Sequence, residues 1–225
     1  DGHTLMLAGN VLSTGRSLYK SVTIDPLRDV RAVVGVSRSP HLVVVSPNFR
    51  GDTINDLIRL AKEQPGKLNC ASAGAGTMPH LAAERFQQVT GAQMTHVPYK
   101  GSGAALQAVM AGQADVYFDI MFSTAALAKA GKLKVLGVSG LERANGFPDV
   151  PTLDEQGVKG FELYSTFGVV ARADTPDAIV GQLNEAINKV LALPAVRGRL
   201  AALGATPIGG ARMPVDRHHG APETT

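Results

Sequence analysis

The chain has 225 residues, 44% of them apolar and 18% charged, so it is long and apolar enough to bury a core without disulfides or structural metal. A net charge of +3 is too small for a nucleic-acid-binding surface, and we expect no nucleic-acid partner. The single Cys excludes an internal disulfide and paired-cysteine metal motifs, and no apolar run approaches the length of a membrane span. One large or two small globular domains are expected.

Short β-branched runs alternate with helical runs in the first half of the chain. Asp52-Thr53 is a helix-start signal, because apolar residues follow it at helical spacing, and Gly91 is a helix-stop signal. The strands expected in this half are 4–8, 33–36, 42–45, 68–72 and 94–97, and the helices are 54–64 and 79–89. The loop 74–77 lies between a strand and a helix.

The same alternation continues toward the C-terminus. The expected strands are 116–120, 133–138 and 167–170, and the expected helices open at 101–103, 124, 175–176 and 194. The alternation predicts an α/β fold with mostly parallel sheets, in which ligands bind at strand carboxyl ends and helix N-termini. Residues 212–225 are polar and aperiodic, and we expect a disordered tail there.

The segment 69–80, NCASAGAGTMPH, carries the strongest signal for a binding site. A strand ends, small residues turn the chain, and a helix begins near Pro79. Small side chains allow a ligand to approach the backbone, and the first amides of a helix favour an anion. The hydroxyls of Ser72 and Thr77 add donors. The alternative is that Gly74 and Gly76 only permit a tight turn.

A second segment, 97–103, repeats this design with a strand end, a turn and a helix start. Tyr99 offers a hydroxyl or an aromatic wall, and the amides from Gly101 onward are candidate donors. Lys100 could pair with an anion, although an isolated Lys is more often a solvated surface charge. Asp119 ends an apolar strand, and two interpretations stay open: it accepts a hydrogen bond from a ligand, or it caps the next segment.

Catalytic and nucleotide-binding motifs are not found. The loop at Gly74 lacks the Lys of a Walker motif and the third glycine of a dinucleotide fingerprint, and neither a GxSxG nor an HExxH motif occurs. A Ser–His–Asp triad assembled in space stays open, because six histidines are scattered along the chain. Cys70 precedes a helix start, which could lower its pKa, but a small buried strand residue is the favoured interpretation. We expect no metal site and no cofactor.

Several strings taken together resemble the Bug family, the extracytoplasmic solute receptors of tripartite tricarboxylate transporters. The strings are SAGAGTMPHLA, HVPYKGSGAAL and GQADVYFD, with DGHTLML, AGKLKVLGVSG and FPDVPTLDEQG in addition. The resemblance implies a two-lobed, type II periplasmic-binding-protein-like fold and periplasmic location, with a signal peptide upstream of this chain. It also implies capture of a small carboxylate, membrane permease subunits as partners, a monomer and no catalysis.

The resemblance further implies a set of ligand-binding residues in three loops and at the crossing between lobes. They are Ser72, Ala73, Gly74, Gly76, Thr77 and His80; Tyr99, Lys100 and Gly101; Asp119; and Ser165, Thr166 and Phe167. One lobe is expected over 1–40 and 164–211 and the other over 41–163. Family members carry a further strand, loop and helix before the position of Asp1 and a helix after Gly209-Gly210, so we expect a chain truncated at both ends.

The resemblance leaves the ligand open among di- or tricarboxylates, amino acids and aromatic acids. Two other functions also stay open. An α/β hydrolase could use Ser72 or Cys70 as its nucleophile, and a sensor subunit could use the same fold and cleft to signal to a partner protein.

Overall fold

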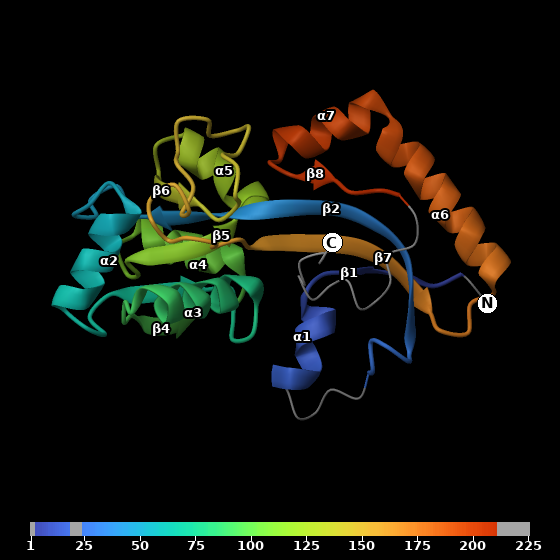
Figure 1. Cartoon of the computed structure of the whole chain (residues 1–225), viewed down its shortest axis with the longest axis horizontal. Coiled ribbons are helices and arrows are strands. Elements are labelled where there is room, and N and C mark those ends of the chain that lie inside the picture. Colours follow the sequence, from blue (N-terminus) through green and yellow to red (C-terminus); the bar gives the residue numbers. More distant parts are fainter. Residues whose placement is uncertain (1–2, 19–23, 211–225) are drawn as a thin grey trace. The chain divides into compact units, whose positions relative to one another are not determined.

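The computed structural model describes residues 3–18 and 24–210. Its strands are β1 (Leu5–Ala8), β2 (Val30–Val45), β3 (Asn69–Ser72), β4 (Thr95–Pro98), β5 (Val116–Ile120), β6 (Lys134–Val138), β7 (Tyr164–Arg172) and β8 (Thr206–Pro207). Its helices are α1 (Val11–Leu18), α2 (Ile54–Glu63), α3 (Met78–Thr90), α4 (Ser102–Met110), α5 (Met121–Lys129), α6 (Asp177–Ala192) and α7 (Pro194–Ala202). Figure 1 shows this order along the chain.

The chain separates into two compact units. Unit 1 comprises Asp1–Arg38, Ser165–Ala201 and Thr206–Thr225, and unit 2 comprises Ser39–Tyr164 and Ala202–Ala205. In unit 1, β1 pairs antiparallel with β7, and β8 pairs antiparallel with β2. The core of this unit forms where α6 covers the strands, through Val33, Val34, Ala171, Val180 and Leu191.

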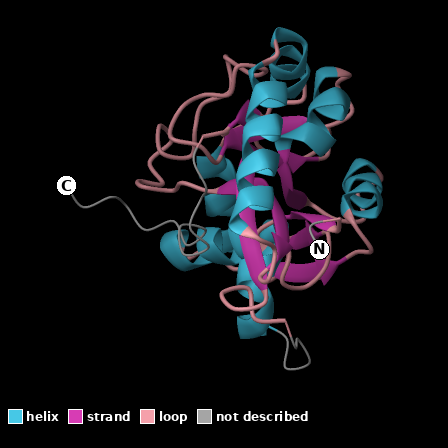
Figure 2. Ribbon diagram, turned by 90° about the vertical axis from the view of Figure 1, so that its right-hand side faces the viewer, coloured by secondary structure: helices cyan, strands magenta, loops and turns pink. Residues whose placement is uncertain are grey.

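Unit 2 is a sheet with the strand order β2-β5-β3-β4, in which β6 also pairs with β2, and it has helices on both faces. Figure 2 shows the helices and strands of the chain in a second view. Alternate residues of one strand point to opposite faces, which divides the core in two. Val43 and Val45 join the cluster that contains α2 and α3, whereas Leu42 and Val44 join the cluster that contains α4 and α5. Burial on both faces explains why the strand 42–45 is an unbroken apolar run.

Several sequence signals are confirmed, the α/β class among them. Thr53 is the N-cap of α2, and its Oγ1 accepts a hydrogen bond from the amide of Asp56 at 3.1 Å. The Asp56 carboxylate accepts in return from the amide of Thr53 at 3.2 Å, which completes a capping box. Gly91 ends α3 with a left-handed φ of 70°.

The expectation of mostly parallel sheets is wrong. Among the strand pairings described, only β3–β4 and β3–β5 are parallel, while β1–β7, β2–β5, β2–β6 and β2–β8 are antiparallel. A strand buried on both faces has the same apolar pattern in either direction, so composition does not reveal the direction.

The separate strands expected at 33–36 and 42–45 are one strand of 16 residues, β2. The polar segment between them indicated a break, but a partner distant in sequence satisfies its buried serine. Ser39 is buried, and its Oγ donates to the carbonyl of Gly204 at 3.0 Å. Pro40 lies between the pairing with β8, which ends at Arg38, and the pairing with β5, which begins at His41.

Sequence analysis did not predict α1, because β-branched residues, serines and Gly15 give its eight residues a low helix propensity. The expected disordered tail, 212–225, lies outside the described residues. None of the helices within 3–18 and 24–210 combines the length and the apolar character needed to cross a membrane.

His41 is fully buried beside the first residues that β2 contributes to unit 2. Its Nδ1 lies 3.2 Å from the carbonyl oxygen of Phe118, and its amide donates to Ser139 Oγ at 2.8 Å. Burial lowers the pKa of His41 to about 4, although the Phe118 carbonyl and Asp119 oppose that shift. The folded protein therefore holds this imidazole neutral at pH values where an unfolded histidine is charged.

Acidification is therefore expected to destabilise the fold through His41. Between the ordinary histidine pKa and about 4, the unfolded chain binds a proton that the folded chain does not, so the free energy of unfolding falls as pH falls through this window. From pH 7.5 to 4.5 this contribution is about 2–3 kcal/mol. Urea unfolding at both pH values should show a smaller loss for His41→Asn than for the wild type, and the control variant His3→Asn should keep the wild-type loss. Equal losses in wild type and His41→Asn would contradict the assignment.

Candidate functional site

The first loop, 72–77, connects the end of β3 to the start of α3 and is held by its own short side chains. The buried Ser72 Oγ accepts from the amide of Gly74 at 3.1 Å, and Thr77 Oγ1 donates to the Gly74 carbonyl at 2.7 Å. Gly74 and Gly76 have φ values of 133° and 76°, which disfavour any residue with a Cβ. Thr77 is the N-cap of α3, but its side chain caps no amide of the first turn. That end of the helix keeps its partial positive charge.

The second loop, 99–101, lies against the first. The amide of Tyr99 donates to the Ser72 carbonyl at 2.9 Å, and the amide of Gly101 donates to the Ala73 carbonyl at 3.1 Å. Gly101 is the N-cap of α4, which likewise has no side-chain cap. The half-buried Tyr99 packs against the core of α4 and α5, and Lys100 is exposed.

Asp119 lies at the third strand end and is fully buried. Its Oδ1 accepts from Ser102 Oγ at 3.0 Å, and its Oδ2 accepts from Ser123 Oγ at 2.7 Å and Thr124 Oγ1 at 2.6 Å. The carboxylate therefore links β5 to the first turns of α4 and α5. Of the two interpretations left open for Asp119, capping of the next segment is wrong, because its partners are hydroxyls and the N-terminus of α5 has no side-chain cap. A hydrogen bond from a ligand stays a prediction.

A pair of stacked imidazoles lies beside the first loop. His80, on α3, accepts a hydrogen bond at Nδ1 from the amide of Gly76 at 3.1 Å. Its ring stacks on His96 of β4, with centroids 4.0 Å apart and an interplanar angle of 24°. His96 Nε2 lies 2.6 Å from Ser72 Oγ. Sequence analysis missed His96, although a polar ring in the short strand that precedes the second loop was a usable signal.

The remaining candidates lie in unit 1, on β7. The amide of Thr166 donates to Asn10 Oδ1 at 2.8 Å, and Ser165 is buried. The half-buried Phe167 ring lies 3.5 Å from where a Cβ on Gly9 would be. The structure thus brings the first loop, the second loop and Asp119 together within unit 2, and it places 165–167 beside Gly9-Asn10 within unit 1.

The loops in unit 2 suit reversible anion binding. β3, β4 and β5 run parallel, so their carboxyl ends share one edge of the sheet, and each strand leads into a helix, α3, α4 or α5. Helix N-termini favour negative charge. Within the described ranges, no group of three or more His, Cys, Asp or Glu side chains is placed to hold a metal ion.

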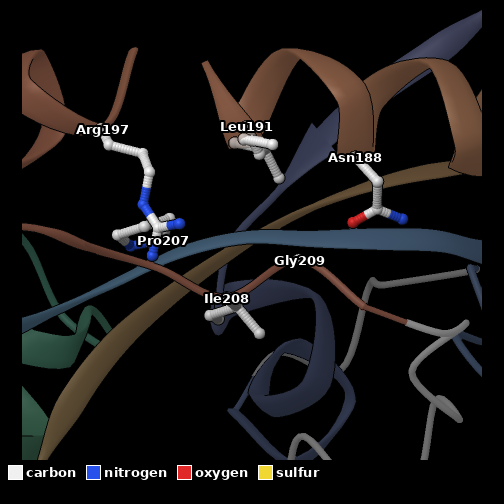
Figure 3. A pocket seen from close by; sticks show the side chains of 7 residues that line it. Asn188, Leu191, Arg197, Pro207, Ile208 and Gly209 are labelled. Atoms are coloured by element: carbon white, nitrogen blue, oxygen red, sulfur yellow. The ribbon is translucent and has the colours of Figure 1, made fainter. Parts of the chain in front are cut away.

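A pocket of about 170 Å³ lies in unit 1, between α6, α7 and the segment around β8 (Figure 3). Asn188, Leu191, Ala192, Arg197, Pro207, Ile208 and Gly209 line it. It contains none of the expected ligand-binding residues and is smaller than most small-molecule sites, which span roughly 300–1,000 Å³. The loops of unit 2 therefore remain the candidate ligand-binding site.

Neither nucleophile of the hydrolase alternative is accessible. Burial raises the pKa of the Cys70 thiol, so the reactive thiolate is disfavoured at neutral pH. Ser72 Oγ lies within hydrogen-bond distance of an imidazole, as in a Ser–His pair, but the residue is fully buried and also accepts from Gly74.

The fold is that of periplasmic binding proteins, because the structure of periplasmic binding protein BugD superimposes with a TM-score of 0.88 at 29% identity, over 97% of this chain and 75% of that chain. The structure described as R. palustris Rpa4515 with adipate superimposes with a TM-score of 0.91 at 31% identity, over 97% of this chain and 73% of that chain. The structure of MatC (Rpa3494) from Rhodopseudomonas palustris with bound malate gives a TM-score of 0.85 at 29% identity, over 97% and 75%. The two-lobed α/β fold expected from the sequence is thereby confirmed.

The chain belongs to the tripartite tricarboxylate transporter family of receptors, whose family model matches residues 1–215. A UPF0065 protein in the tcbD-tcbE intergenic region of Pseudomonas sp. (strain P51) is 38% identical over 94% of this chain and 63% of its own length. Protein BugT of Bordetella pertussis is 34% identical over 92% of this chain and 64% of its own length. The chain thus spans less than two thirds of the length of these relatives.

Two glycines at the start of α4 allow a test of whether the second loop needs a residue with a positive φ at position 101. A Cβ on Gly101 or on Gly103 meets no atom within 4 Å, but only Gly101 has a positive φ, 93°. Gly101→Ala should lower the free energy of unfolding by about 1–3 kcal/mol, because the substitution forces a residue with a Cβ into a glycine conformation. The matched control Gly103→Ala should be neutral or stabilising by up to about 1 kcal/mol, because Gly103 lies in a helix. Urea unfolding measures the free energy of unfolding of both variants. Equal changes in the two variants would show that the second loop does not need a glycine at position 101.

Cys70 provides a direct test of the nucleophile alternative. Because the thiol is buried and its pKa is raised, iodoacetamide should not label the folded protein at pH 7.5 over hours, and labelling should become complete in 6 M urea. Mass spectrometry of the labelled peptide is the readout, and Cys70→Ala controls for labelling elsewhere. Rapid labelling of the folded chain would show that Cys70 is reactive and would support the hydrolase alternative.

Proposed function

We propose that the whole protein is a periplasmic receptor that binds a small organic carboxylate and delivers it to the membrane permease subunits of a tripartite tricarboxylate transporter. Family membership over residues 1–215 supports the transporter role. The adipate and malate in the Rpa4515 and MatC structures support a dicarboxylate as the ligand class. The similarity to periplasmic binding protein BugD supports a periplasmic location.

The observation that carries this proposal is the pair of adjoining loops at the carboxyl ends of β3 and β4. Both lead into helices without side-chain caps, and two backbone hydrogen bonds hold them together. A carboxylate that leaves water needs several converging donors, which amides and hydroxyls supply without a fixed positive charge. The proposed contacts in unit 2 are Ala73, Gly74, Gly76, Thr77, Tyr99, Lys100 and Gly101, and the fully buried Ser72 holds the first loop from within. Ser165, Thr166 and Phe167 are the candidates in unit 1.

Binding without catalysis is part of the proposal. The groups that could attack or transfer a proton are already engaged within the protein: Asp119 accepts from three hydroxyls, and Ser72 is paired with Gly74 and His96. A sensor would use the same ligand site and would differ in the protein that it contacts.

Calorimetric titration of the whole protein with adipate and with malate at pH 7.5 tests the proposal. At least one should bind with a Kd on the order of micromolar, which corresponds to about −8 kcal/mol. Adipamide, the neutral diamide of adipate, is the matched control and should not bind, because it lacks the charge that the helix N-termini favour. Circular dichroism confirms that the protein is folded. If a folded protein binds no di- or tricarboxylate, amino acid or aromatic acid, the proposal is wrong.

A further inference from the structure

We propose that His80 and His96 are positioning residues that hold the first loop in its binding geometry only while both rings are neutral, so that carboxylate affinity falls at acid pH. This inference rests on the proposed function. It concerns the control of the first loop and adds no contact with the ligand.

His80 acts on the loop through the amide of Gly76. The Gly76 N–H donates to Nδ1 at 3.1 Å, so this nitrogen must carry no proton. Gly76 is buried and has a φ of 76°. The hydrogen bond therefore fixes a glycine conformation in the loop that leads into α3.

His96 acts on the loop through Ser72. Ser72 Oγ accepts from the amide of Gly74 at 3.1 Å and lies 2.6 Å from His96 Nε2. The Ser72 hydroxyl has one proton, and donating it to an unprotonated Nε2 satisfies both groups inside a buried site. The two imidazoles thus fix the two glycine amides of the first loop, that of Gly76 directly and that of Gly74 through Ser72.

Protonation reverses both hydrogen bonds. A proton on His80 Nδ1 turns the acceptor of the Gly76 amide into a donor facing a donor. A proton on His96 Nε2 obliges the Ser72 hydroxyl to find another acceptor. Because the rings stack at 4.0 Å, two imidazolium charges would also repel each other. The first step releases the Gly76 amide, and the second leaves the buried Ser72 hydroxyl proton without its acceptor.

The other ionisable groups to consider come from α3, β3 and the residue that precedes β5. Glu84 of α3 faces His80, with Oε1 3.6 Å from Nε2, and it favours the charged form of His96. Cys70 of β3 is the register partner of His96 and carries a neutral thiol. Asp115, which precedes β5, accepts from the amide of Asn69 at 2.7 Å. Burial, followed by the proximity of His80, lowers the pKa of His96 despite Glu84, so this ring is neutral near pH 7.

A direct ion pair predicts the opposite trend. If His80 contacted the ligand carboxylate as a cation, protonation would strengthen binding at acid pH. In the positioning role, the ligand binds the neutral form, so its affinity declines as the rings become charged. The sign of the pH dependence therefore separates the two roles.

The test is calorimetric titration with adipate and malate at pH 7.5, 6.5 and 5.5. The Kd of the wild type should rise as the pH falls from 7.5 to 5.5, because binding must expel any proton that the pair has taken up. The double variant His80→Asn with His96→Gln places uncharged amides near Nδ1 and Nε2. Compared with its own affinity at pH 7.5, the double variant should lose much less affinity at pH 5.5 than the wild type loses, and the loss that remains reports protonation of the ligand itself. The control His3→Asn should keep the wild-type profile.

A second measurement needs no ligand. In ¹⁵N spectra of the free protein, the amide signals of Gly74 and Gly76 should shift with the imidazole signals of His80 and His96 between pH 7.5 and 5.5, and they should not shift in the double variant. If no carboxylate binds at pH 7.5, the proposed function is wrong. The amide spectra would then show by themselves whether His80 and His96 hold the first loop. Glycine amides that do not titrate with the histidines, or an affinity that stays constant or rises at acid pH, would overturn the inference.

Discussion

The parallel pairing of β3 with β4 and β5 is the constraint on which the candidate site depends. Parallel strands end at the same edge, and the hydrogen bonds continue past the strand ends, from Tyr99 to Ser72 and from Gly101 to Ala73. Backbone geometry therefore sets the distance between the two loops, independently of the side chains that they carry. This explains how a site can be built largely from glycine, alanine and small hydroxyl residues: the sheet supplies the rigidity that such residues lack.

Buried polar groups complete this arrangement. Asp119 joins the first turns of α4 and α5, and the histidine pair joins α3 and β4 to the first loop. Among the described residues, every buried side-chain nitrogen and oxygen atom has a hydrogen-bond partner. Since an unpaired polar group in the core is destabilising, such networks favour one loop conformation over its alternatives. A receptor benefits from this preorganisation, because less ordering is needed when the ligand binds.

Neutral donors also suit a protein that must release its ligand. A buried lysine or arginine would hold a carboxylate through a strong ion pair, whereas amides and hydroxyls bind it through several weaker contacts. In the loops of unit 2, Lys100 is exposed, and the described donors are amides and hydroxyls. The stacked imidazoles add titratable groups next to these donors without placing a fixed charge there.

The sequence by itself determined the α/β class, most helices and strands, the glycine-rich loops and the family, because apolar periodicity, caps and glycine positions are local signals. The tertiary structure alone decided strand direction, the continuity of β2 through Ser39 and Pro40, and the α1 helix, since these depend on partners distant in sequence. Only the tertiary structure showed that Asp119 accepts hydrogen bonds from three hydroxyls. Only it showed that His96 stacks on His80 and lies within hydrogen-bond distance of Ser72. The position of His96 beside Ser72 is set by the register between β3 and β4, which no local pattern records.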